Sequence, residues 1–356
     1  RGFYAAIGCQ RGRKPGISGE NAEGAYAAVD FLREAGAKES FALEGDVVVV
    51  GGGNVAIDAA RISSRCTDAK ISMFCLEARE KMPASNEETE EALEEGIELN
   101  CGWGPKEVLE ENGHVSGVVF KKCTRVLDAQ GRFSPEYDEE ETITVPCKHV
   151  IFSVGQAIDW GNMLDNLDLK RRPNGRALAN RLTYQTSEPD IFVGGDVYTG
   201  PKFAIDAIAA GREGAISLHR YVHENCTLTI GRNRRDFVEL DKENISIDSY
   251  DTSKRQVPEK ADEKAQAATF RDLSHSLTEE QVKVETSRCL SCGASVVDPN
   301  QCIGCGICTT RCVFDAIHLH RELPGASVMH ASEDKLKYIL PNMVKQSVKV
   351  KFAKKK

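Results

Sequence analysis

The chain lacks the long apolar runs and the excess of basic residues that would indicate a membrane or a nucleic-acid partner. No apolar stretch approaches the ~18 residues that a membrane-spanning helix requires. Acidic residues outnumber basic ones, 54 against 46, and the resulting net charge of −8 opposes binding to a polyanion. We therefore expect neither a membrane span nor a nucleic-acid partner.

The composition is that of a globular protein with room for two or three domains. The chain has 356 residues, of which 41% are hydrophobic and 28% are charged. Its first residues already lie within a predicted strand, so we expect it to be the C-terminal part of a longer polypeptide. We also expect a cytoplasmic, reducing setting, in which disulfides are improbable for the 13 cysteines.

Six of the cysteines lie within residues 289–312, CLSCGASVVDPNQCIGCGICTTRC. Four of them have the spacing CxxCxxCxxxC, which is typical of bacterial ferredoxins: Cys302, Cys305, Cys308 and Cys312. Two intervening residues let a short loop aim three thiolates at one face of a cubane, and the fourth cysteine is expected to begin a helix. With Cys289 and Cys292 upstream, the sequence predicts at least one 4Fe-4S cluster.

The number of clusters stays open, because two cubanes with four thiolates each need more ligands than these six cysteines. Either one cluster uses Cys302, Cys305 and Cys308 with one upstream thiol, or two clusters take a ligand from elsewhere in the chain. Zinc is a weaker alternative. A zinc ribbon separates its CxxC pairs by about 12 to 20 residues, whereas nine residues separate Cys292 from Cys302.

Residues 46–60, DVVVVGGGNVAIDAA, predict a dinucleotide-binding turn. Four consecutive valines indicate a strand that is buried on both faces, as in a parallel sheet. Gly51 permits the tight turn, Gly53 lets the backbone approach a pyrophosphate, and an alanine three residues later allows close packing of a helix on the strand. The helix is expected to begin near Asn54, so that amides from Asn54 and Val55 onward face the phosphates.

The next predicted strand, residues 71–76, ends at an acidic residue, Glu77, about two dozen residues past the glycines. A carboxylate there accepts hydrogen bonds from both ribose hydroxyls of NAD and repels the additional phosphate of NADP. We therefore expect a preference for NAD(H). The alternative is that Glu77 is a solvated loop charge beside Arg79, which could itself bind a phosphate.

The segments around these motifs alternate between helical and strand patterns. Apolar residues at helical spacing predict a helix within residues 21–36, and residues 87–100 are expected to form an acidic helix with a capping Gly96. Residues 105–154 predict a β meander whose last strand returns to the sheet. Residues 231–285 lose periodicity and fill with charge, which predicts a linker that ends in a short capped helix before Cys289.

A second strand–turn–helix unit lies at residues 191–211, IFVGGDVYTGPKFAIDAIAAG. A buried strand runs into Gly195 and Asp196, and a Gly-Pro turn precedes an alanine-rich helix. An acidic residue after a strand can bind a polyol hydroxyl, and amides at a helix start can point at an electron-rich ring. The alternative is an ordinary strand–turn–helix unit in which Asp196 only caps.

Five segments in this order resemble the FAD- and NAD(P)-binding small subunit of glutamate synthase and its relatives, including the large subunit of bifurcating ferredoxin transhydrogenases. The segments are AIG at 6–8, VVVVGGGNVAIDAA, REKMPAS at 79–85, SVGQ at 153–156 and GGDVYTGPKFAIDAIAAG. The resemblance covers about residues 3–225. It implies an α/β fold with two dinucleotide-binding, Rossmann-like domains, the NAD domain being inserted in the FAD domain. A small α+β ferredoxin-like iron–sulfur domain would follow.

The domain division that follows from this resemblance uses every part of the chain. The FAD domain would consist of the end of its first half, residues 1–43, and its returning half, 154–230, with the NAD(H) domain, 44–153, inserted between them. After them would come a linker at 231–285, the ferredoxin-like domain at 286–325 and a basic tail at 326–356. The family's first FAD glycine motif and N-terminal cluster domain do not occur in the printed residues. We expect the complete protein to bind FAD.

The resemblance also implies site residues. The nicotinamide nucleotide would be held by Gly51, Gly53, Asn54 and Val55. The pyrophosphate and ribityl region of FAD would be held by Gly195 and Asp196, and a helix start would be placed against the isoalloxazine by Pro201, Ala204 and Ile205. The cofactor-binding set also includes Gly155. Family members that use NADPH carry two arginines where this sequence has Leu76 and Glu77, which again favours NAD(H).

These features predict an oxidoreductase subunit that passes electrons between NAD(H), FAD and an iron–sulfur cluster. A flavin is needed between a two-electron hydride donor and a one-electron cluster. No side chain needs to act as an acid or base, so no catalytic residue is assigned. The expected partners are other subunits of a redox complex and ferredoxin or another iron–sulfur protein, with flavin-based bifurcation as one form. The alternatives are a glutamate-synthase-like electron donor to an amidotransferase partner, and a non-catalytic redox-sensing or wiring subunit.

Overall fold

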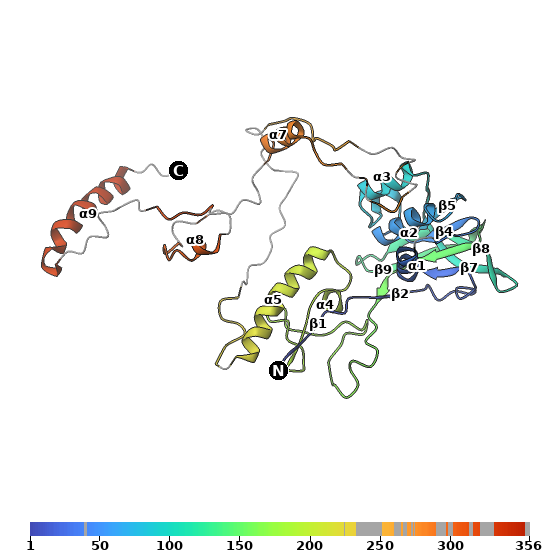
Figure 1. Cartoon of the computed structure of the whole chain (residues 1–356), viewed down its shortest axis with the longest axis horizontal. Helices are drawn as coiled ribbons and strands as arrows, with labels where there is room; N and C mark the ends of the chain where they lie inside the picture. The colour runs from blue at the N-terminus through green and yellow to red at the C-terminus, as the bar shows by residue number, and fades with distance from the viewer. Residues whose placement is uncertain are drawn as a thin grey trace. The chain divides into compact units, whose positions relative to one another are not determined.

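The computed structural model describes residues 1–38, 41–223, 225–232, 251–259, 265, 269–271, 273, 275–289, 297, 302–312, 316–320 and 331–352. They belong to two compact units, Arg1–Arg288 and Cys289–Lys356 (Figure 1). Among the described helices, none combines the length and the apolarity needed to cross a bilayer.

A five-stranded parallel sheet forms the centre of the first unit. In spatial order its strands are β3 (Ala25–Ala27), β10 (His149–Phe152), β4 (Val47–Val50), β5 (Ile71–Cys75) and β6 (Glu98–Cys101). Strand β10 pairs in parallel with both β3 and β4, and Val150 lies opposite Ala25 on one side and Val48 on the other. The chain therefore returns from the meander into the middle of the sheet.

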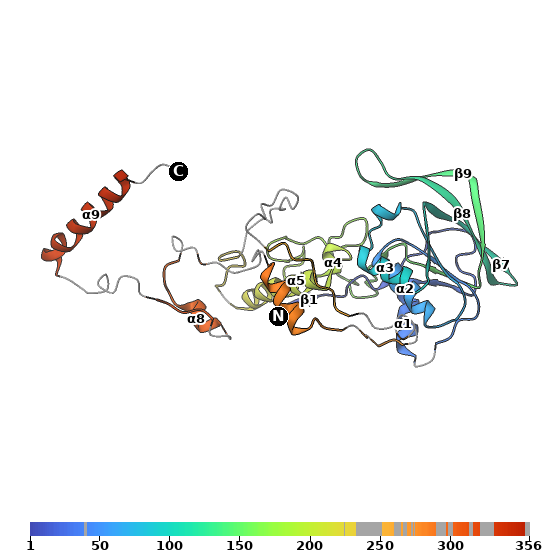
Figure 2. The same ribbon diagram turned by 90° about the horizontal axis from the view of Figure 1, so that it is seen from above.

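The side chains of β4 point alternately to the two faces of the sheet, so the apolar core has two layers. Val47 and Val49 belong to the apolar cluster formed with three helices, whereas Val48 and Val50 pack with a three-stranded antiparallel sheet on the opposite face (Figure 2). The helices are α1 (Ala28–Ala37), α2 (Asn54–Ser64) and α3 (Asn86–Glu94), and the antiparallel strands are β7 (Trp103–Glu111), β8 (His114–Leu127) and β9 (Phe133–Pro146). Burial on both faces explains the unbroken apolar run of the strand.

The first and last strands of the first unit form a second, smaller part. Strand β1 (Phe3–Ala5) pairs in parallel with β12 (Ile191–Val193), β2 (Arg11–Gly12) pairs in antiparallel with β11 (Gln156–Ala157), and helices α4 (Asp196–Thr199) and α5 (Ala204–Val222) follow. Tyr4 fixes α5 to this part, because its hydroxyl donates to the Ala210 carbonyl at 3.0 Å. A Cβ at Gly194 or Gly214 would come within 1.9 or 2.1 Å of the Tyr4 side chain. The absence of a side chain at both glycines therefore leaves room for the tyrosine ring.

Two of the predicted helices have different bounds in the structure. The pattern over residues 21–36 comprises strand β3, which joins the sheet of β4 although it precedes residue 44, and helix α1, which packs in the apolar cluster on one face of that sheet. The acidic helix predicted over 87–100 ends earlier, at Glu94, and the predicted capping residue Gly96, at φ +85°, turns the chain into β6. A left-handed glycine after a helix is the common way to end it.

The remaining described elements are helical. They are η1 (Arg79–Lys81), α7 (Glu279–Ser287), α8 (Ile307–Arg311), η3 (Ser332–Asp334) and α9 (Lys335–Phe352). The expected capped helix before Cys289 is α7, whose N-terminus carries a capping box between Thr278 and Gln281. Cys312 does not begin a helix as expected; it follows α8 in an extended conformation as the C-cap.

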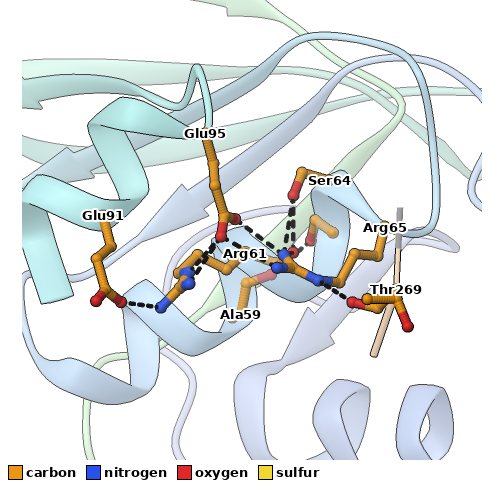
Figure 3. A network of polar contacts seen from close by, with 8 residues as sticks. Ala59, Arg61, Ser64, Arg65, Glu91, Glu95 and Thr269 are labelled. Carbon is orange, nitrogen blue, oxygen red and sulfur yellow. Dashed lines mark hydrogen bonds and ion pairs between the residues drawn. The ribbon is translucent and has the colours of Figure 1, made fainter. Parts of the chain in front are cut away.

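A buried ion-pair network joins α2 to the end of α3 (Figure 3). The carboxylate of Glu95, whose side chain is 2% exposed, accepts hydrogen bonds from Arg61 at 2.7 and 3.0 Å and from Arg65 at 2.9 and 3.0 Å. Burial alone would raise the pKa of Glu95, but the hydrogen bonds and charges of Arg65 and Arg61 outweigh it and lower that pKa. Arg65 also donates to the Thr269 carbonyl at 2.8 Å, which holds this later segment against α2.

Candidate functional site

A cavity of about 1210 Å³ opens where β4, β5 and β10 end at the carboxyl edge of the parallel sheet. The glycine turn after β4 lines one side of it, and Trp103, Lys121 and Tyr137 of the antiparallel sheet line another. Further lining comes from residues 12–15 and 201–203. Ligands of open α/β folds bind at this edge of the sheet.

The two motif glycines serve different needs. Gly51 has φ +146°, and a Cβ there would lie 2.5 Å from the Ser153 carbonyl oxygen, so this glycine allows β10 to pack against the turn. Gly53, the N-cap of α2, has ordinary extended backbone angles, and a Cβ there would meet no atom within 4 Å. The space beside Gly53 is therefore open toward a ligand, and the first amides of α2 have no side-chain cap.

Glu77 lies directly against this turn. A Cβ on Gly52 would come within 2.8 Å of a Glu77 carboxylate oxygen, and Glu77 lines the cavity. The Glu77 carbonyl accepts from the Gly102 amide at 3.2 Å, which positions the end of β5. Arg79 instead lies in η1, where it donates to Asn86 at 3.3 Å, and it is not among the lining residues.

The predicted cofactor residues are divided between this cavity and its surroundings. Gly51, Gly53, Asn54, Val55, Glu77, Gly155 and Pro201 line it, whereas Arg79, Gly195, Asp196, Ala204 and Ile205 do not. Asp196 is the first residue of α4, and its carboxylate accepts from the amide of Lys202, in the loop before α5, at 3.2 Å; this contact caps neither helix. Helix α5 begins at Ala204 without a side-chain cap, and the Ile205 side chain is exposed. An accessible, uncapped helix start fits an anionic or electron-rich ligand.

Sequence reasoning missed the cationic lining of the cavity. Arg13, Lys14, Lys121 and Lys202 all contribute to it. They come from three separate segments, and the single local signal was the basic run RGRK at residues 11–14, which contains Arg13 and Lys14. Lys121 is held over the Tyr137 ring at 4.2 Å from its centroid and bonds Glu139 at 2.6 Å.

The predicted cluster ligands are not gathered in the described part of the chain. Cys289, Cys302, Cys305 and Cys308 are exposed, and Cys312, which is half-buried, accepts a hydrogen bond from the Ala316 amide at 3.4 Å. Cys292 lies outside the described residues. Within the ranges described, no three His, Cys, Asp or Glu side chains form a group that could hold a metal ion. The cluster prediction therefore rests on the sequence spacing.

Residues 5–211 match a family model described as pyridine nucleotide-disulphide oxidoreductase. This match spans more than half of the chain and includes every residue that lines the cavity. The chain belongs to this family of flavin- and pyridine-nucleotide-dependent oxidoreductases.

Its curated relatives are redox subunits. The chain is 28% identical to the NADP(+)-dependent formate dehydrogenase subunit beta of Moorella thermoacetica, over 81% of this chain and 42% of that protein. It is 31% identical to the glutamate synthase (NADPH) small chain of Escherichia coli, over 60% of this chain and 48% of that protein. The chain thus spans less than half the length of these relatives.

The fold has a solved counterpart in FprA from Mycobacterium tuberculosis. One structure of that protein superposes with a TM-score of 0.50 at 17% sequence identity, covering 62% of this chain and 63% of that one. At this identity the likeness concerns the fold, and it agrees with the parallel α/β sheets described above.

Replacing Gly53 with alanine is expected to weaken NADH binding about tenfold or more, because the added methyl group occupies the space that a phosphate needs. The free energy of unfolding should change by less than about 1 kcal/mol, as at an ordinary N-cap. Gly51→Ala is the matched contrast: its strained φ and its clash with Ser153 should cost about 2 kcal/mol or more. Nucleotide titration and thermal unfolding of both variants measure the two effects, and unchanged NADH affinity in Gly53→Ala would refute the assignment.

Proposed function

We propose that this chain is the pyridine-nucleotide-binding and electron-transfer part of a flavoprotein subunit. It would pass electrons between NAD(H), FAD and a 4Fe-4S cluster within a larger redox complex. The observation that carries the proposal is the meeting of the glycine turn, the uncapped start of α2 and Glu77 in one cavity at the sheet edge. Family membership supports the same conclusion.

The residues present fit a dinucleotide by shape and by charge. The open space beside Gly53 admits a pyrophosphate to the amides of α2, and Arg13 and Lys14 add positive charge to the same cavity. Glu77 supplies an acceptor for ribose hydroxyls. When bound, NAD(H) and FAD supply the hydride and electron chemistry. The chain's own residues bind and orient them, and none is required to transfer a proton.

Glu77 supports NAD(H) over NADP(H), although both relatives named above carry NADP in their names. The carboxylate lies against the backbone of the turn, where it would repel a 2′-phosphate. The selectivity of this chain would then differ from what those names state.

The 4Fe-4S cluster is proposed from the CxxCxxCxxxC spacing, and the described residues do not form a cluster-binding arrangement. Iron and acid-labile sulfide analysis of anaerobically purified protein should give at least four of each per chain. Purified protein that contains zinc without sulfide would contradict the cluster.

The proposed function is tested by anaerobic titration of the complete protein with NADH and, separately, with NADPH. The absorbance of the flavin is followed first and the electron paramagnetic resonance signal of the cluster second. We expect NADH to bleach the flavin and then to reduce the cluster, with NADPH much less effective. If neither nucleotide reduces the flavin, the oxidoreductase assignment fails and a non-catalytic wiring or sensing subunit takes its place.

A second candidate is an electron donor to an amidotransferase partner, favoured by the 31% identity to the glutamate synthase small chain. It predicts NADH-dependent glutamate formation from glutamine and 2-oxoglutarate when the partner is added. The first candidate instead predicts electron delivery to ferredoxin. Reduction of ferredoxin that requires a second, high-potential acceptor at the same time would identify bifurcation.

A further inference from the structure

We propose that Cys75 and Cys101 form a redox-sensitive dithiol beside the nucleotide cavity, which closes to a disulfide when a peroxide oxidises it and thereby weakens dinucleotide binding. The chemistry of the pair follows from its own geometry. Its effect on binding rests on the proposed function, because it regulates the same site.

The two cysteines lie opposite each other on neighbouring strands. Strands β5 and β6 pair in parallel with Cys75 in register with Cys101, and the two Sγ atoms are 3.7 Å apart. Neighbouring strands are about 4.8 Å apart, which lies within the Cα separation of about 4.4 to 6.8 Å that disulfides adopt. Side-chain rotation can therefore bring the sulfurs to bonding distance without separating the strands.

The pair connects the sheet edge to the turn that would hold the nucleotide. Cys75 is buried and lines the cavity, and its Sγ donates to the Glu77 carbonyl at 3.5 Å. A Cβ on Gly52 would come within 3.1 Å of the Cys75 Cβ. Cys101 is only half-buried. Burial first, and then the neighbouring Cys101 and Glu77, raise the pKa of Cys75, so Cys101 is the thiol that an oxidant meets first.

The oxidation balances with hydrogen peroxide as the oxidant. The Cys101 sulfur bonds to one peroxide oxygen as the O–O bond breaks, which gives a sulfenic acid and one water. The Cys75 sulfur then bonds to the Cys101 sulfur, and the S–OH bond breaks to release a second water. The two thiols together lose two electrons and two protons, and the peroxide is reduced to two waters.

Closure of the disulfide removes the hydrogen bond from the Cys75 thiol to the Glu77 carbonyl, which releases the backbone of Glu77 from the end of β5. Glu77 and Gly52, both of which contact this end, would then lose their alignment with a bound ribose. We expect NADH to bind about tenfold more weakly to the oxidised protein, equivalent to the loss of one hydrogen bond to a charged group. Dithiothreitol should restore the affinity.

The test compares the complete protein with Cys101→Ser and with Cys123→Ser, a nearby thiol whose Sγ contacts the Arg125 carbonyl instead. Each is treated with hydrogen peroxide, then digested without reduction and analysed by mass spectrometry for the peptide pair that contains Cys75 and Cys101. NADH affinity is measured before oxidation, after oxidation and after reduction.

We expect the crosslinked peptides and the reversible loss of affinity in the wild type and in Cys123→Ser, and neither of them in Cys101→Ser. Absence of the crosslink, or an equal loss of affinity in Cys101→Ser, overturns the inference. A crosslink that leaves NADH affinity unchanged overturns the regulatory role. If the reduced protein binds no dinucleotide at all, both the proposed function and the regulatory role of the cysteine pair are wrong. The presence or absence of the crosslink still tests whether the pair forms a disulfide.

Discussion

Replacing Glu95 with alanine is expected to lower the free energy of unfolding of the first unit by about 3 kcal/mol. The carboxylate is almost fully buried between Arg61 and Arg65, and its removal leaves two guanidinium groups that are 23% and 10% exposed without their shared partner. Removing one member of a buried ion pair costs about 3 to 5 kcal/mol, and the partial exposure of Arg61 puts this case at the lower end. Urea unfolding followed by circular dichroism measures the change.

The control is Glu90→Ala, an exposed position on the same helix, where a change within about 0.5 kcal/mol is expected. Acid adds a second check. Because the folded pKa of Glu95 is lowered, its contribution is complete above the pKa of an unfolded glutamate and is lost as pH falls through the folded value. The difference in stability between wild type and Glu95→Ala should therefore be constant from neutral pH to about 4.3 and shrink below it. A difference that stays the same in stronger acid would contradict the network.

Glu77→Arg is expected to weaken NADH binding about 100-fold and to make NADPH the better ligand. The wild-type carboxylate lies against the glycine turn and lines the cavity, where it can accept from ribose hydroxyls. Hydrogen bonds to charged groups contribute about 1.5 to 3 kcal/mol, or roughly 10- to 150-fold in affinity. A guanidinium at this position would attract the 2′-phosphate that the carboxylate repels. Fluorescence titration of the variant with both nucleotides measures the exchange.

Two further variants isolate the charge. Glu77→Gln keeps the shape and loses the charge, so NADH affinity should fall about tenfold, while NADPH, which is no longer repelled, should gain less affinity than in Glu77→Arg. The control is Glu80→Gln, because Glu80 is exposed in η1 and does not line the cavity; this variant should bind NADH as the wild type does. Tighter binding of NADPH than of NADH by the wild type would contradict the assigned role of Glu77.

The parts of the fold that were predicted correctly are those that contiguous residues determine. The valines of β4 are buried on both faces, and GxGxxA places α2 at Asn54, so strand, turn and helix could be read from one short segment. The α/β class with Rossmann-type sheets is confirmed by the family and by the solved counterpart. The assignment of cofactor residues stays a prediction, and the cavity supports part of it.

What the sequence could not provide depends on pairings between distant segments. Strand β3 was hidden within a helical pattern, because Ala25–Ala27 is short and apolar and its partner β10 lies far downstream. The approach of Cys75 to Cys101 requires the register of β5 and β6. The cationic lining required segments from three parts of the chain to converge. Cys312 was wrongly placed at a helix start, because thiol spacing does not specify the backbone conformation.

The position of β10 between β3 and β4 has a consequence for biosynthesis. A growing chain exposes β3 and β4 early, but these strands have no contact with each other until β10 has been made and inserted between them. Such non-local pairing folds slowly. The contact of Gly51 with Ser153 ties the glycine turn to the same late step. A dinucleotide bound at this turn would therefore stabilise only chains whose synthesis has passed residue 153 and whose sheet is complete.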